Sequence, residues 1–266
     1  QIEGAWQADG KGESVWDMLA HQKGRVWEGH TGDTACDHYN RYKEDVALLS
    51  QMDLQAYRLS VSWPRVLPRG TGRVNEAGLG FYDRLVDELL ATGIQPWVTL
   101  FHWDYPYELF LRGGWLHPDS PKWFADYTAI VVDRLSDRVV HWITLNEPQC
   151  LIGLGHLHGD HAPGLKLGLR EVLQAGHHSL LAHGLSVQTI RSRAKQTPLI
   201  GWAPVGSVHY PATDSAADIA AAYAGMDAVG DGHCWNNRWW GDAPVLGSYP
   251  EQGLKAYGKN APSFKD

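Results

Sequence analysis

The sequence is poor in cysteine. Its 266 residues include three cysteines, Cys36, Cys150 and Cys234. An odd number at wide spacings predicts neither a disulfide framework nor a zinc site. We therefore expect buried, reduced thiols and a cytoplasmic location, because reducing compartments keep cysteines in that state. The chain begins with Gln rather than Met, so an upstream signal peptide remains an open alternative.

Positive charge and long apolar runs are also scarce. The chain has 23 Lys and Arg against 30 Asp and Glu, a formal net charge of −7, and shows no basic stripe. This balance argues against nucleic acid or an anionic membrane surface as a partner. No run of 18 apolar residues is present, so we expect no transmembrane helix. A neutral small molecule is the partner that this composition favours.

Aromatic residues, by contrast, are abundant. Thirteen tryptophans and eleven tyrosines are a high content for this length. Aromatic faces stack on the apolar faces of sugar rings, which suits a carbohydrate cleft. The alternative is an aromatic-rich core, which we expect to account for most of them.

Strand and helix patterns alternate along the chain. Four segments predict strands, at 57–63, 96–103, 139–146 and 199–203, and three amphipathic segments between them predict helices, around 81–90, 123–135 and 170–193. After Trp202 the sequence looks like aromatic-rich loop. The β-α-β-α rhythm predicts a parallel sheet with covering helices, either a closed barrel or an open doubly wound sheet.

A carboxylate stands at the end of one predicted strand. The apolar segment 139–146 runs into Asn146 and Glu147, and Pro148 then ends it because proline cannot donate to a sheet ladder. A carboxyl group held at a strand tip is well placed for proton transfer to a substrate. The competing interpretation is a helix N-cap at a strand-to-helix turn.

Five segments together resemble the family 1 glycoside hydrolases, the β-glucosidase-like retaining enzymes. They are 1–5 (QIEGA), 57–65 (YRLSVSWPR), 96–104 (PWVTLFHWD), 144–148 (TLNEP) and 235–240 (WNNRWW). The resemblance runs along essentially the whole chain and implies a (β/α)8 TIM barrel that hydrolyses terminal β-linked sugars. It implies no cofactor and no metal. The expected ligand is a β-glycoside or an oligosaccharide.

The resemblance also implies roles for individual residues. Glu147 matches the general acid/base, and Asn146 matches an asparagine that binds the sugar 2-hydroxyl beside the bond that breaks. Gln1, His102 and Trp103 match positions that hold the hydroxyls of the non-reducing sugar. Glu147 must carry a proton near neutral pH in this role, which burial beside apolar neighbours favours.

Arg58 matches an arginine that lies near the catalytic nucleophile in the family. The nucleophile there belongs to a Thr-Glu-Asn-Gly motif, and this sequence contains no Glu-Asn-Gly. A buried guanidinium needs a carboxylate partner. We therefore expect Arg58 to be buried and poorly satisfied, and the chain to be less stable for it.

The spacing of the predicted strands indicates an incomplete barrel. They start near residues 57, 96, 141 and 198, about 47 residues apart. Eight such units would need roughly 380 residues, more than a typical barrel uses. We expect residues 1–266 to be a single catalytic-domain fragment with about strands 2–5 of the barrel and their helices. It would be a truncated product, one half of a split enzyme, or part of a longer polypeptide.

As a glycosidase, the chain would be catalytically competent once a nucleophile is supplied from elsewhere. Two other functions compete with this one. The first is an inactive sugar-binding or assembly fragment that needs another chain or an oligomer. A lyase or aldolase barrel using Glu147 as a base would need a Schiff-base lysine or a metal at a strand tip, and neither is found. Three histidines, His156, His158 and His161, resemble a metal tract, but the family has a His-bearing loop here without a metal.

Overall fold

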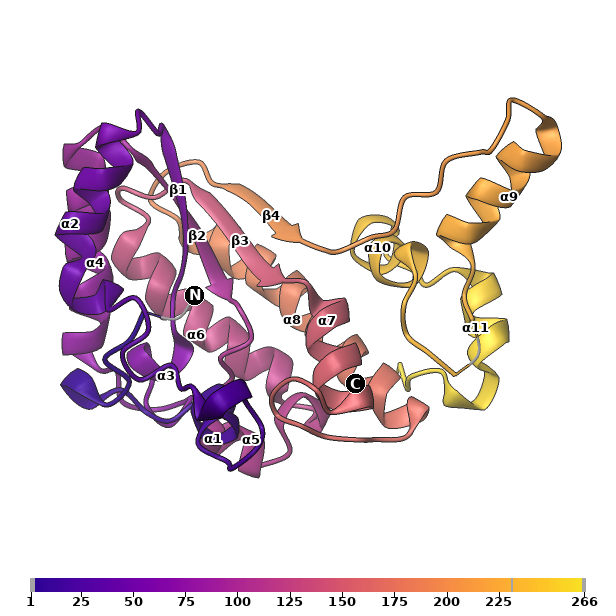
Figure 1. Ribbon diagram of the computed structural model, residues 1–266, viewed down its shortest axis with the longest axis horizontal. Helices are drawn as coiled ribbons and strands as arrows, with labels where there is room; N and C mark the ends of the chain where they lie inside the picture. Colours follow the sequence, from indigo (N-terminus) through magenta and orange to yellow (C-terminus); the bar gives the residue numbers. More distant parts are fainter. Residues whose placement is uncertain (1–2, 231, 265–266) are drawn as a thin grey trace.

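The protein is built on a four-stranded parallel sheet. The computed structural model describes residues 3–230 and 232–264. Its strands are β1 (Ala56–Ser60), β2 (Gln95–Phe101), β3 (His141–Asn146) and β4 (Leu199–Ala203), in the order β1-β2-β3-β4. All three pairings are parallel (Figure 1). The predicted partial barrel is confirmed, although β1 ends before Trp63, which begins a short helix.

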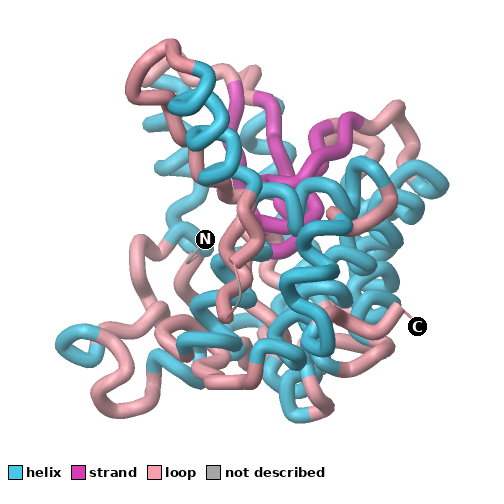
Figure 2. The backbone as a smooth tube through the Cα atoms, turned by 90° about the vertical axis from the view of Figure 1, so that its right-hand side faces the viewer, coloured by secondary structure: helices cyan, strands magenta, loops and turns pink. Residues whose placement is uncertain are grey.

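Long helices connect and cover the strands. Helix α4 (Glu76–Ala91) joins β1 to β2, α6 (Ser120–Leu135) joins β2 to β3, and α8 (Leu169–Arg193) joins β3 to β4. Helix α2 (His38–Gln51), which the sequence analysis did not predict, precedes β1. Figures 1 and 2 show this helical layer beside the sheet. A left-handed glycine, Gly93 with φ 79°, follows α4 and allows the turn into β2.

The segment after β4 is helical rather than loop-like, which corrects the sequence-based expectation. It contains α9 (Ala216–Asp227), α10 (Asn237–Leu246) and α11 (Glu251–Tyr257), which lie beyond the carboxyl end of β4 (Figure 1). Ser215 caps α9 and Asn236 caps α10 through their side chains. The fully buried Trp240 anchors α10 close to Gly176 of α8, where an added Cβ would lie 2.8 Å from its ring.

The remaining short helices lie near the ends of the strands. They are α1 (Val15–Ala20), α3 (Trp63–Val66), α5 (Tyr107–Leu111) and α7 (Pro148–Ile152). Among the residues that the structure describes, no helix is long and apolar enough to cross a membrane.

Aromatic side chains fill much of the core, as expected. Trp63 stacks on Tyr127 with ring centroids 5.0 Å apart, and Phe101 and Phe124 pack against the same indole. Five tryptophans are essentially inaccessible to solvent: Trp63, Trp115, Trp142, Trp239 and Trp240. The expectation of three buried thiols holds for Cys234 but is wrong for Cys36, which is exposed, while Cys150 is half-buried.

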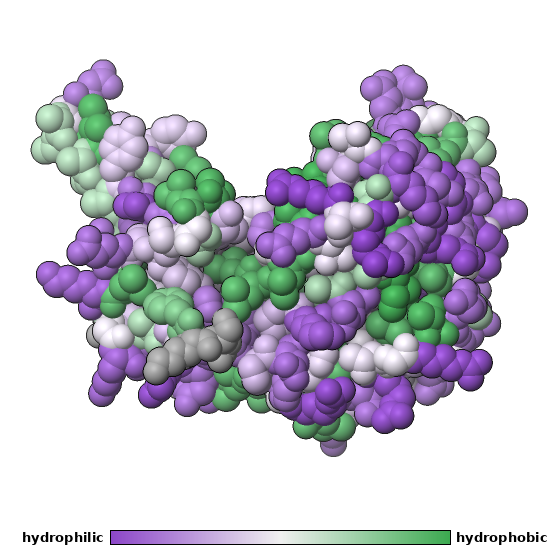
Figure 3. All heavy atoms as spheres, turned by 180° about the vertical axis from the view of Figure 1, so that it is seen from behind, coloured by the Kyte–Doolittle hydropathy of each residue, from purple (hydrophilic) through white to green (hydrophobic). Residues whose placement is uncertain are grey.

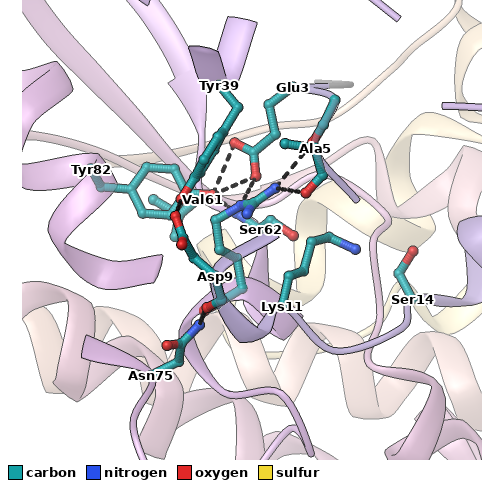
Figure 4. A network of polar contacts seen from close by, with 12 residues as sticks. Glu3, Ala5, Asp9, Lys11, Ser14, Tyr39, Val61, Ser62, Asn75 and Tyr82 are labelled. Carbon is teal, nitrogen blue, oxygen red and sulfur yellow. Dashed lines mark hydrogen bonds and ion pairs between the residues drawn. The ribbon is translucent and has the colours of Figure 1, made fainter. Parts of the chain in front are cut away.

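A buried ion pair fixes the amino-terminal segment to the sheet. Glu3, 6% exposed, pairs with the fully buried guanidinium of Arg65, and the Tyr82 hydroxyl donates to both Glu3 oxygens at 3.0 Å. Arg65 also donates to the carbonyls of Gly4 and Ala5, at 3.1 and 3.2 Å, and lies over the Tyr39 ring. Figure 4 shows this network around Glu3 and Tyr82. The segment leading into the cavity described below is therefore held in place.

We expect Glu3→Gln to destabilise the fold strongly, because it leaves the Arg65 charge buried without its carboxylate. Breaking a buried pair from one side costs about 3–5 kcal/mol of unfolding free energy. Urea unfolding would measure the loss. Arg41→Gln removes an exposed pair with Glu44 and is the matched control, with no measurable change expected. Equal stability of Glu3→Gln and the parent chain would contradict this account.

Candidate active site

The carboxyl ends of β2 and β3 bring the predicted polar residues together. His102, Trp103 and Asp104 follow β2, and Asn146 ends β3 with Glu147 next in the chain. Parallel strands end at the same edge of a sheet, which is why Trp103 and Asn146, 43 residues apart in sequence, meet here. Gln1, the remaining predicted sugar-binding residue, lies outside the described residues.

Asn146 is the centre of this cluster. It is 4% exposed, and its Oδ1 accepts a 2.6 Å hydrogen bond from Nη2 of Arg58, which lies in β1. Its backbone carbonyl accepts a 2.7 Å bond from the indole Nε1 of Trp103. The β3–β4 register shifts between Ile143 and Asn146, and such irregularities re-aim side chains at strand ends. With its oxygen engaged by Arg58, the amide can offer its nitrogen to a ligand.

Glu147 occupies a strained position with its side chain available. Its φ of 40° and ψ of 64° are left-handed, and its N–H donates to the Ala203 carbonyl of β4 at 2.7 Å. It is the N-cap residue of α7, as the competing interpretation proposed, yet its side chain makes no capping hydrogen bond. Such strain in a non-glycine residue, about 1–3 kcal/mol, is typical of functional sites. The half-buried carboxylate is therefore not used to cap the helix.

The Cys150 thiol, in the first turn of α7, contacts that carboxylate. Burial, together with the charge and hydrogen bond of Glu147, raises the pKa of Cys150 to about 11. The thiol therefore keeps its proton at neutral pH and can donate it to Glu147.

His102 and Trp103 present a neutral imidazole and an indole beside Asn146. Burial lowers the pKa of His102 to about 4, with the positive charge of Arg58 acting in the same direction. The ring is therefore neutral at physiological pH and offers one donor and one acceptor. Trp103 has a left-handed φ of 80°, and its ring lies 5.5 Å from that of His161.

A cavity of about 470 Å³ opens beside these two residues. Two tryptophans that the sequence analysis did not single out, Trp6 and Trp16, contribute to its wall, together with Lys11, Asp17, His102, Trp103 and Asp104. Burial raises the pKa of Asp104 to about 6, against a hydrogen bond from Ser62 that lowers it. Aromatic faces beside hydrogen-bonding groups suit a polyhydroxylated ligand. Only long-range packing brings Trp6 and Trp16 to this place, and no local motif marks them.

Arg58 differs from the prediction. It is exposed rather than buried, and it donates to two neutral acceptors, Thr99 Oγ1 at 2.9 Å and Asn146 Oδ1 at 2.6 Å. Arg58 lies in β1, an edge strand of the sheet, and its side chain remains in contact with solvent. The argument that a buried, unpaired charge weakens the chain is therefore wrong, because water solvates the guanidinium.

The remaining sequence features have structural explanations. His156 is buried and its Nδ1 lies 3.1 Å from the Leu151 carbonyl, whereas His158 is exposed. Across the described ranges, no group of three His, Cys, Asp or Glu side chains could hold a metal ion.

Comparison with known proteins identifies the family to which these features correspond. A family model described as "Glycosyl hydrolase family 1" matches residues 1–266. Beta-glucosidase A of Acetivibrio thermocellus is 45% identical over 259 residues, which are 97% of this chain and 56% of that protein. Beta-glucosidase A of Thermotoga maritima is 43% identical over 268 residues, covering 100% of this chain and 58% of that protein.

Solved structures give the same result. The family 1 β-glucosidase from Thermotoga maritima superimposes with a TM-score of 0.88 and 41% identity, covering 99% of this chain and 57% of that one. Its complex with deoxynojirimycin matches with the same score and identity. The chain thus spans just over half the length of the relatives that it matches.

The neutral state of His102 predicts a pH dependence of stability. An unfolded histidine takes up a proton near pH 6.5, whereas folded His102 resists it until about pH 4. The free energy of unfolding should therefore fall as the pH is lowered through this window. His102→Gln keeps a donor and an acceptor without the titration, so it should lose less stability than the parent between pH 7 and pH 4.5 in urea unfolding. Equal losses in the two proteins would contradict the neutral, half-buried imidazole.

Proposed function

This chain belongs to glycosyl hydrolase family 1, and we propose that it carries the acid/base half of a retaining β-glucosidase-like site for terminal β-linked sugars. The observation that carries the proposal is the position of Glu147. The residue stands at the carboxyl end of β3 in a strained conformation, beside Asn146, with a side chain that does not cap the following helix. The resemblance and the local geometry agree on this residue.

In the proposed mechanism, Glu147 acts twice. It first donates its proton to the glycosidic oxygen as the bond between that oxygen and the anomeric carbon breaks. A nucleophilic carboxylate forms a bond to the anomeric carbon in the same step. It then removes a proton from the water that displaces this carboxylate, so that the enzyme is regenerated and the β configuration is retained.

Four residues would hold the sugar. Asn146 donates its amide to the 2-hydroxyl, a bond that strengthens as the transition state forms. Gln1, His102 and Trp103 hold the other hydroxyls of the non-reducing sugar. The neutral imidazole of His102 would donate a hydrogen bond to one hydroxyl and accept a hydrogen bond from another. Thermotoga maritima β-glucosidase has been solved with deoxynojirimycin and with castanospermine, which supports a small, sugar-like ligand for this site.

The nucleophile must come from outside these residues. The sequence contains no Glu-Asn-Gly segment, and the chain matches just over half the length of its relatives. A complementing chain or an oligomer would supply the second carboxylate, with Arg58 close to it. We assign residues 1–266 to a single catalytic-domain unit.

The alternative is a catalytically inactive sugar-binding or assembly fragment. The same missing segment favours it, because two carboxylates are required for either stereochemical course.

We also infer a cytoplasmic location. Cys150 and Cys234 are both unpaired thiols, and a reducing compartment preserves that state.

Turnover of an aryl β-D-glucoside by the purified chain tests the proposal. Glu147→Gln should reduce the rate about 10²- to 10⁴-fold, the usual contribution of a positioned proton donor. Glu108→Gln, at an exposed glutamate of α5, is the matched control and should turn over like the parent. Turnover that survives Glu147→Gln would contradict the assignment, and no turnover by the parent would favour the inactive fragment.

A further inference from the structure

The backbone pairing between β3 and β4 meets two prolines where the strands end. A hydrogen bond at the end of this pairing runs from the Glu147 N–H to the Ala203 carbonyl at 2.7 Å. Pro148 and Pro204 come next in the two segments, and neither has an N–H with which to continue a ladder. Glu147 therefore stands at the point where the backbone pairing of the sheet is interrupted.

The side-chain amide of Gln149 takes over from the backbone at this point. Its Nε2 donates to the Val205 carbonyl at 2.9 Å, and its Oε1 accepts from the Val205 N–H at 3.4 Å. A carboxamide carries both a donor and an acceptor, like a peptide group, so it can bond to both polar groups of one residue as a strand does. Gln149 is 2% exposed, and both ends of its amide are engaged inside the protein.

A change of chain direction at Glu147 explains why Val205 needs this partner. In a continued parallel ladder, the Val205 N–H would be directed at the Glu147 carbonyl. That carbonyl instead accepts from the N–H groups of Cys150 and Leu151, at 3.0 and 3.1 Å, where the chain turns into α7. The Gln149 side chain therefore replaces a bond that the start of the helix withdraws from the segment after β4.

A second side-chain amide makes the same pair of bonds two residues further along. Asn237, the first residue of α10, donates from Nδ2 to the Ser207 carbonyl at 2.7 Å and accepts from the Ser207 N–H at 2.9 Å. The chain beyond Ser207 connects the body of the molecule to the α9 region (Figure 1), below the notch that Figure 3 shows between these two parts. The segment 203–207 is thus held at alternate residues, Ala203, Val205 and Ser207.

We propose that Gln149 is a positioning residue for Glu147. By holding Val205, the amide keeps the Ala203 carbonyl, two residues earlier, where it accepts from the N–H of the strained Glu147. Helix α7 has five residues and receives no cap from the Glu147 side chain, so contacts from outside the helix must fix its first turn. The inference rests on the proposed function, because a misplacement of about 1 Å in an acid/base can reduce a rate about 10²-fold.

Amide hydrogen exchange, resolved by NMR on the whole 266-residue chain, tests the clamp without any sugar. Gln149→Met keeps the side-chain volume and removes both bonds. The amides of Val205 and Glu147 should then exchange about tenfold faster, the effect of one lost hydrogen bond. Gln51→Met makes the same change at an exposed residue that ends α2, and it should leave both amides unchanged.

The affinity for deoxynojirimycin, measured by titration calorimetry at two pH values, tests the consequence for the site. A protonated glutamic acid offers one donor and one acceptor in place of the amide, whereas its carboxylate has no donor and repels the Val205 carbonyl. Burial raises the pKa of such a carboxyl group, which favours the protonated form at pH 5.

Relative to the parent at the same pH, Gln149→Glu should therefore bind about tenfold more weakly at pH 8 and nearly as tightly at pH 5. Gln149→Met should be weaker by a similar factor at both pH values. A role confined to the overall stability of the chain would give no such recovery at the lower pH. Gln51→Glu is the matched control and should follow the parent at both pH values.

Unchanged exchange of Val205 or Glu147 in Gln149→Met, or no recovery of Gln149→Glu at pH 5, would overturn the inference. If Gln149→Met does not fold, the protection factors of the two amides in Gln149→Glu at pH 8 and pH 5 make the same comparison. A parent chain that does not bind deoxynojirimycin would contradict the proposed function instead. The exchange of the Glu147 amide would still decide whether Gln149 holds that residue, so the two failures are distinguishable.

Discussion

The hydrogen bonds of Asn146 hold the carboxyl ends of three neighbouring strand units together. Arg58 reaches it from β1, and Trp103 reaches it from the turn after β2. Hydrogen bonds that involve a charged group contribute about 1.5–3 kcal/mol, and a buried polar group that loses its partner is penalised by a similar amount. Because Asn146 is almost fully buried, these bonds set the places of Trp103 and, through the next peptide, of Glu147.

Two residues next to Asn146 in space have a strained backbone, and contacts from both edges of the sheet hold them in place. Glu147 and Trp103 both adopt left-handed conformations that disfavour non-glycine residues. The bond from the Glu147 N–H to Ala203 makes β4 part of the support. On the other side, the Glu3–Arg65 pair anchors the segment that carries Trp6 and Trp16 to the cavity wall. The candidate site is thus preorganised by elements at both ends of the sheet.

Much of this arrangement was predictable from sequence because it depends on local patterns. Alternating or continuous apolar segments defined all four strands, and the strand-ending Pro148 located Glu147. Helix α9 was missed because its alanine-rich sequence has no amphipathic period, and α10 depends on burying Trp239 and Trp240 against distant residues. The exposure of Arg58 was mispredicted because burial on an inner face depends on strands across the barrel. The cavity beside His102 likewise arises from long-range packing that no local motif encodes.

The central claim is that Glu147 and its neighbours at the strand ends form a glycoside site. The affinity of the chain for deoxynojirimycin, measured by titration calorimetry, tests this claim most directly. The ring nitrogen of this sugar mimic is basic, so it should take the proton that Glu147 gives up as general acid and then pair with the resulting carboxylate, if the strand-end cluster is a glycoside site. Replacing the carboxylate by an amide in Glu147→Gln should weaken binding about tenfold or more, the equivalent of one charge-assisted hydrogen bond. Equal affinity for the parent and for Glu147→Gln would contradict the account, because the ligand would then bind without the residue on which the proposed chemistry depends.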